Sequence, residues 1–71
     1  MIERNPIPAK RVLRTKAVME YCGISRTTLH RLMTKGVFPK PIQLSEGGRP
    51  AWVISELDAW LDQRIRARDA A

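Results

Sequence analysis

The side chains with the clearest chemistry lie in the segment from Gly23 to Lys35, which carries two arginines, a lysine, a histidine and several hydroxyl groups. If this segment is helical, Leu29, Leu32 and Met33 share one face and the polar side chains lie on the others. Arginine can pair with both acceptors of a guanine edge, threonine can contact a thymine methyl group, and N–H groups at a helix N-terminus attract phosphate. These residue types favour contact with a nucleic acid, although a solvated helix face opposite a buried stripe presents the same types.

Local signals define the elements that present these side chains. Gly23 can adopt a positive φ and end a preceding helix, Ser25 can accept a hydrogen bond as the N-cap of the next helix, and Gly36 is suited to end that helix near Lys35. A short apolar stretch at residues 12–13 precedes the first helix. That helix is expected over residues 16–22, with Thr15 as its N-cap. Two helices joined by a tight turn are the helix-turn-helix pattern, in which the second helix enters the major groove of DNA.

A β-hairpin is predicted after the second helix. Residues 42–44 alternate as a strand, a Gly-containing turn follows, and residues 49–52 form the return strand, where Pro50 is best suited to an edge position. Lys40 and Arg49 place positive charge at the base of the hairpin and on its return strand. A hairpin in this place is a wing.

A third helix is expected to open at residues 54–58, with Ser55 as its N-cap. Its apolar residues follow helical spacing and are expected to close a core that also holds Tyr21, Cys22, Phe38 and Trp52; they are Leu57, Trp60, Leu61 and Ile65. The predicted fold is mainly α with a small β-hairpin, a winged helix-turn-helix of three helices plus a wing.

The net charge of +6 is unevenly distributed along the 71 residues. Residues 1–49 carry ten Lys and Arg against three Glu, whereas residues 50–71 carry three Arg against four acidic side chains. A basic surface of this kind favours polyanions such as DNA, RNA or an acidic membrane. A chain of this length buries only about 60% of its unfolded surface, which leaves room for one small core and argues against a large catalytic cleft. We expect a flexible basic arm over residues 1–11, a DNA-binding domain over residues 12–68 and a tail over residues 69–71.

Several classes of protein are disfavoured. His30 is the single histidine and Cys22 the single cysteine, and the sequence shows no metal-site spacing, no phosphate loop and no nucleophile with an evident base. We therefore expect neither an enzyme nor a cofactor. One cysteine allows no internal disulfide, and neither a signal-peptide apolar region nor a membrane-length apolar run is present, so a cytoplasmic location is expected.

Four motifs, in this order, resemble the AlpA family of small prophage regulators. They are Gly23-Ile-Ser-Arg-Thr-Thr-Leu-His-Arg-Leu, Gly36-Val-Phe-Pro-Lys-Pro-Ile, Gly48-Arg through Trp52, and Ser55-Glu-Leu-Asp-Ala-Trp-Leu61. The resemblance covers residues 12–66. It implies a MerR-like or excisionase-like winged helix-turn-helix protein that regulates transcription of integrase or excision genes, or that acts as an excisionase-type architectural factor. Bulky Met19 departs from the commonest helix-turn-helix pattern, which has a small residue four positions before the turn glycine.

The resemblance also implies which residues contact DNA. On the second helix they are Ser25, Arg26, Thr27, Thr28, His30 and Arg31, and on the wing the contact is Arg49. Lys16, Lys35, Lys40 and the arm are expected to contact phosphates. One short helix reads few base pairs, so several copies are expected on repeated or palindromic sites, and integrase or RNA polymerase are further possible partners.

Our hypothesis is a sequence-specific, double-stranded DNA-binding transcriptional regulator of a prophage or mobile genetic element. One alternative is an excisionase that bends DNA and recruits integrase, and another is the DNA-recognition domain of a terminase small subunit. From a different class comes a protein-interaction module whose basic face docks an acidic partner. RNA binding remains an alternative on charge alone, although the sequence shows no aromatic stacking surface.

Overall fold

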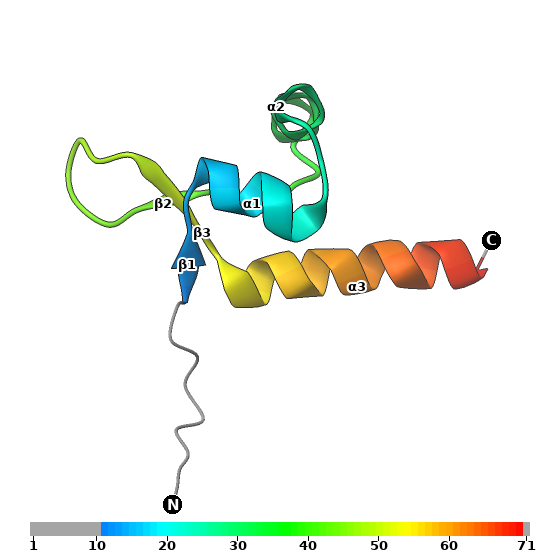
Figure 1. Ribbon diagram of the computed structural model, residues 1–71. Helices are drawn as coiled ribbons and strands as arrows, with labels where there is room; N and C mark the ends of the chain where they lie inside the picture. Colours follow the sequence, from blue (N-terminus) through cyan, green and yellow to red (C-terminus); the bar gives the residue numbers. More distant parts are fainter. Residues whose placement is uncertain (1–10, 71) are drawn as a thin grey trace, which may run out of the picture.

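The computed structural model describes residues 11–70 of the chain, which form three helices and three short strands (Figure 1). In chain order they are β1 (Val12–Leu13), α1 (Thr15–Cys22), α2 (Arg26–Lys35), β2 (Ile42–Gln43), β3 (Pro50–Val53) and α3 (Ile54–Ala70). The predicted fold class is confirmed: the protein is mainly helical, with a small antiparallel hairpin in the position of a wing. The expected arm, apart from Arg11, and residue 71 of the expected tail lie outside the described residues.

The three strands form one antiparallel sheet in the order β1-β3-β2. In β1, Val12 lies opposite Val53 and Leu13 opposite Trp52, so the apolar stretch before the first helix is a strand that the sequence analysis did not predict. Strand β3 is therefore central, but Pro50 itself has a neighbouring strand on one side only, in agreement with the expected edge position. Proline is tolerated there because β1 reaches only the Trp52–Val53 end of β3, which leaves Pro50 paired with β2 alone.

Two predicted helix caps are wrong. Helix α1 starts at Thr15 itself, and the N-cap position belongs to Arg14, which makes no side-chain cap. Helix α3 starts at Ile54, so Ser55 lies inside its first turn. For α3 the reason lies at Ile54, whose N–H donates to the carbonyl of Arg11 at 2.9 Å. Strand pairing thus supplies a partner for a backbone donor at the start of α3 that a capping side chain would otherwise satisfy.

A single core holds the elements together. Its buried side chains come from all three helices, the segment after α2 and strand β3; they are Val18, Leu29, Phe38, Trp52 and Leu57. Leu13, Met19, Cys22, Ile24, Leu32 and Trp60 pack against this cluster and are partly buried. Packing roles for Phe38 and for both tryptophans are confirmed.

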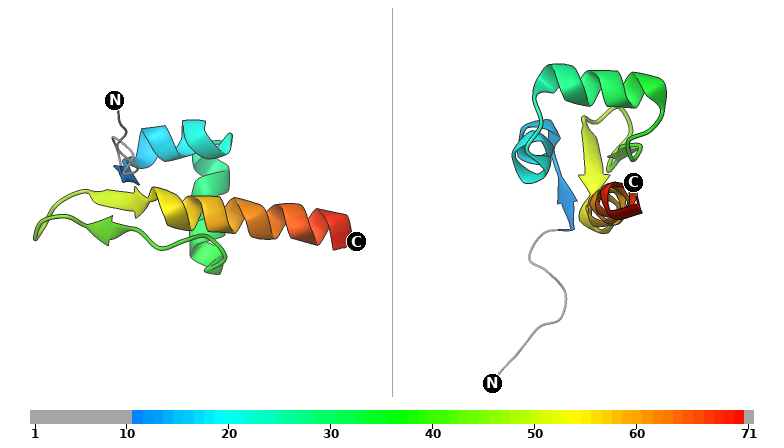
Figure 2. Two further views of the ribbon diagram at one scale, coloured as in Figure 1. Left: turned by 90° about the horizontal axis from the view of Figure 1, so that it is seen from below. Right: turned by 90° about the vertical axis from the view of Figure 1, so that its right-hand side faces the viewer.

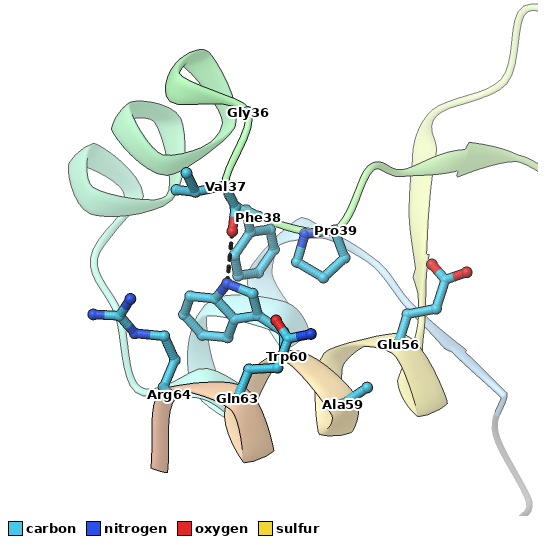
Figure 3. Close-up of a pocket in the computed structure, with 9 residues that line it drawn as sticks. All are labelled: Gly36, Val37, Phe38, Pro39, Glu56, Ala59, Trp60, Gln63 and Arg64. Carbon is cyan, nitrogen blue, oxygen red and sulfur yellow. Dashed lines mark hydrogen bonds between the residues drawn. The ribbon is translucent and has the colours of Figure 1, made fainter. Parts of the chain in front are cut away.

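The segment between α2 and β2 is attached to the core through two indoles. Trp52 Nε1 donates to the carbonyl of Pro39 at 3.1 Å, and Trp60 Nε1 donates to the carbonyl of Val37 at 2.7 Å. The ring of Trp60 also meets that of Phe38 edge to face, with centroids 4.8 Å apart. Figure 3 shows Trp60 together with Phe38 and Pro39 around a pocket between this segment and α3. The path from the second helix to the wing is therefore fixed by packing and hydrogen bonds.

Tyr21 and Ile65 were expected in the core, and both are instead exposed. The hydroxyl of Tyr21 donates to Oδ1 of Asp58 at 2.6 Å, which connects α1 to α3 across the surface. This hydrogen bond raises the pKa of Tyr21, because ionisation would remove the donor. Ile65 is exposed because the C-terminal half of α3 extends past the end of α1, as Figure 1 shows.

Replacing Leu57 tests the single-core description. Its side chain is fully buried, so Leu57→Ala is expected to lower the free energy of unfolding by ~2–5 kcal/mol. Leu44→Ala is a matched control, because the Leu44 side chain is 56% exposed and its loss should change stability by less than ~0.5 kcal/mol. Urea unfolding followed by circular dichroism measures both. Similar losses in the two variants would contradict a core centred on Leu57.

Candidate nucleic-acid interface

Helix α2 is positioned by glycines at both ends and by a serine cap. Gly23 and Gly36 adopt left-handed conformations, with φ of 70° and 74°, in which other residues are strained. Ser25 has the extended backbone of an N-cap, and its Oγ accepts the N–H of Thr28 at 3.1 Å. These three predicted signals are confirmed, and the helix begins and ends where they indicated.

The cap also limits what two predicted site residues can contact. The Ser25 hydroxyl donates to Oγ1 of Thr28 at 3.0 Å, in addition to accepting the Thr28 N–H. The Thr28 side chain is only partly exposed. Ser25 and Thr28 therefore stabilise the start of α2, and their hydroxyl groups already have partners.

The outward face of α2 gathers four of the predicted residues. Arg26, Thr27, His30 and Arg31 are exposed and together line a shallow hollow on the surface of the helix. On the opposite side Leu29 is buried in the core, which fixes the rotation of the helix about its axis. Figure 2 shows α2 at the outside of the molecule, across from α3. Four side chains with hydrogen-bonding groups are thus held on one accessible helix face.

A groove leads from this face toward the wing. It is lined by Arg26 and His30 from α2 and by Thr15 and Pro50 from the first positions of α1 and β3. Met33 also lines it and is 37% exposed, so its expected place on the buried side of the helix is wrong. The groove makes the start of α1 and the base of the wing part of the same surface as α2.

The structure brings together two predicted residues that are distant in sequence. Lys16 and Arg49 line one hollow at the base of the wing, with Arg14, Thr15 and Pro50. Arg14 was not predicted as a site residue. Its Nη1 donates to the carbonyl of Arg49 at 2.9 Å and, less closely, to that of Pro50 at 3.4 Å. Nothing in the local sequence indicates this contact, which depends on how the wing folds back against β1 and α1.

Two further predicted residues lie at the margins. Lys35 is in the last turn of α2, one turn beyond Arg31, where it complements the helix dipole. Lys40 lies in the segment that leads into β2. Both side chains are exposed.

The electrostatic balance of the surface is strongly positive. Residues 11–49 contain eight Lys and Arg and only two acidic residues, Glu20 and Glu46. Across residues 11–70 the one salt bridge joins Arg68 and Asp69 on α3, far along the chain from α2 and the wing. The cations of α2 and the wing base therefore have no acidic partner within the described part of the chain. Such a surface attracts a polyanion.

Other kinds of site find no support in the described residues. Between residues 11 and 70, no group of three or more His, Cys, Asp or Glu side chains could hold a metal ion. Of the helices in that range, none combines the length and apolar character needed to cross a membrane.

Comparison with known proteins identifies a family and a relative. Residues 11–65 match the family described as prophage CP4-57 regulatory protein (AlpA). The chain is also 44% identical over 62 residues to the uncharacterized protein ORF88 of Enterobacteria phage P4, an alignment that covers 87% of this chain and 69% of that protein. No solved structure matches the chain.

The cap at Ser25 can be tested through stability. Ser25→Ala removes the acceptor for the Thr28 N–H and is expected to lower the free energy of unfolding by ~1 kcal/mol. Ser25→Asp keeps an acceptor at the cap and should retain most of the stability. Thermal unfolding monitored by circular dichroism measures both variants. Equal losses for alanine and aspartate would show that the hydrogen bond does not stabilise α2.

Proposed function

The chain belongs to the AlpA family of prophage regulatory proteins, and we propose that it acts by binding double-stranded DNA sequence-specifically, with α2 in the major groove. The observation that carries this proposal is the exposed group Arg26, Thr27, His30 and Arg31 on the outward face of α2. A major groove admits one α-helix, and it presents a different pattern of donors and acceptors for each base pair.

The proposed contacts divide into two kinds. Arg26, Thr27, His30 and Arg31 would contact base edges, because they lie on the face that would enter the groove. Lysines and the wing arginine would contact backbone phosphates on either side; they are Lys16, Lys35, Lys40 and Arg49. Ser25 and Thr28 would act indirectly by fixing the start of the helix, since their hydroxyl groups bond to each other.

The biological role we propose is transcriptional control in a prophage or mobile genetic element. The family match supports a regulatory role, and the basic surface supports DNA as the target. A helix of ten residues reads few base pairs. We therefore propose that several copies bind repeated or palindromic sites spaced by about 10 bp on one face of the duplex.

Selection from a random duplex pool at two salt concentrations tests sequence-specific binding. We expect a recurring motif that persists at the higher salt, because base contacts do not depend on counterion release as phosphate contacts do. The spacing of repeats in the recovered sequences would give the number and orientation of copies. Binding without a motif that disappears as salt rises would contradict the proposal.

Substitutions on α2 test which side chains contact bases. Arg26→Ala and Arg31→Ala are each expected to cost ~1–3 kcal/mol of binding free energy and to relax specificity at one position of the motif. Arg66→Ala is a matched control, because it removes the same charge from the exposed C-terminal half of α3. Fluorescence anisotropy with the selected duplex and with a scrambled duplex measures both effects. An equal loss on the two duplexes would identify the arginine as a phosphate contact.

A further inference from the structure

We infer that the hollow lined by Arg14, Lys16 and Arg49 is a binding site for one backbone phosphate of DNA, and that Arg14 also positions the wing at this site. The inference rests on the proposed function, since it names a contact within the proposed DNA surface. We call this feature the wing-base hollow; its lining residues are Arg14, Thr15, Lys16, Arg49 and Pro50.

The positive charge around the wing-base hollow favours the binding of an anion. Three cationic residues from two distant parts of the chain line it, and no acidic residue does. The first turn of α1, which borders it, also contains no acidic residue. Like charges held close together repel one another, and an anion placed between them adds an attraction to each cation that offsets this repulsion. A phosphate diester offers two charged acceptor oxygens to such a group.

Only one nitrogen of the Arg14 guanidinium donates a hydrogen bond within the described part of the chain. A guanidinium has five N–H donors, and in Arg14 the contacts to the carbonyls of Arg49 and Pro50 both come from Nη1. Nε and Nη2 make no hydrogen bond to another part of the described chain. One side chain can therefore hold the backbone at the start of β3 and still donate to a phosphate oxygen.

The position of the hollow points to DNA as the source of the phosphate. Thr15 and Pro50 line both the wing-base hollow and the groove that contains Arg26 and His30 of α2. The two depressions thus share a border, and a backbone beside the major groove occupied by α2 would pass over it. Arg14 also holds the backbone of Arg49 at the base of the wing through the hydrogen bond to its carbonyl. It is therefore a positioning residue as well as a phosphate contact, because it keeps Arg49 of the wing beside Lys16 of α1.

Methylphosphonate scanning tests the phosphate contact. Single phosphates of the selected duplex are replaced, one at a time, by neutral methylphosphonates, and the affinity of the full chain is measured by fluorescence anisotropy. Among the positions that weaken binding, we expect one per bound copy that is coupled to the wing-base hollow, where the replacement weakens binding about tenfold, the size of one charge-assisted hydrogen bond. At that position the replacement should cost less in Arg14→Ala and in Lys16→Ala than in the unsubstituted protein, because one of the cations that contact the phosphate is already lost.

The salt dependence gives an independent reading of the same contact. Arg14→Ala should weaken binding about tenfold on the unmodified duplex and reduce the slope of log affinity against log salt by ~0.9. Arg66→Ala, which removes a charge distant from the hollow, should leave the methylphosphonate pattern unchanged. If no position responds to Arg14→Ala, or if Arg14→Ala and Arg66→Ala behave alike, the phosphate site is refuted.

The positioning role of Arg14 is tested by combining variants. If Arg14 holds the wing, the Arg14→Ala/Arg49→Ala double variant should lose less affinity than the product of the two single losses, because Arg49 is already displaced when Arg14 is absent. Losses that multiply would refute the positioning role. Should Arg14→Ala lower the thermal stability, Lys16→Ala supplies the phosphate test, since its side chain makes no hydrogen bond within the described residues.

Failure of this inference is distinguishable from failure of the proposed function. If selection yields a motif but no phosphate is coupled to the hollow, only the present inference fails. If selection yields no motif, the proposed function itself fails.

Discussion

Trp52 is the residue on which the arrangement of this small protein depends most. It lies in the central strand of the sheet, opposite Leu13 of β1, and its ring is buried with side chains from all three helices. Its indole N–H binds the carbonyl of Pro39, which fixes the segment that leads from α2 to the wing. One side chain therefore joins the sheet, the core and the path to the wing, and a chain of this size has no second core to replace it.

Helix α2 and its cap could be predicted from sequence because the signals are local. Gly23, Ser25 and Gly36 act through their own backbone conformations or through a hydrogen bond three residues away, and each does what its type predicts. Helical spacing also separated Leu29 from the polar face correctly. It failed at Met33, because whether a side chain at the edge of an apolar stripe is covered depends on the neighbouring elements.

Most of the features that were missed depend on contacts between distant parts of the chain. Strand β1 has two residues, too few for alternation to be visible, and it exists through pairing with β3. The cap predicted at Ser55 was wrong because β3 continues directly into α3, where Ile54 finds its partner in the backbone of Arg11. The contact between Arg14 and the base of the wing is likewise a product of the tertiary fold. In the candidate site, sequence identified residue types on α2 and the wing, and only the fold revealed that Lys16 and Arg49 share one hollow with Arg14.

The direct junction between β3 and α3 has a mechanical consequence. Val53 ends the strand and Ile54 begins the helix, with no loop between them to absorb a change of direction. Figure 2 shows the hairpin and α3 extending in opposite directions from this junction, on either side of the core. Trp52 of the strand and Leu57 of the helix are buried in the same core, one on each side of this junction. The direction in which the hairpin leaves the core is therefore tied to the direction of α3.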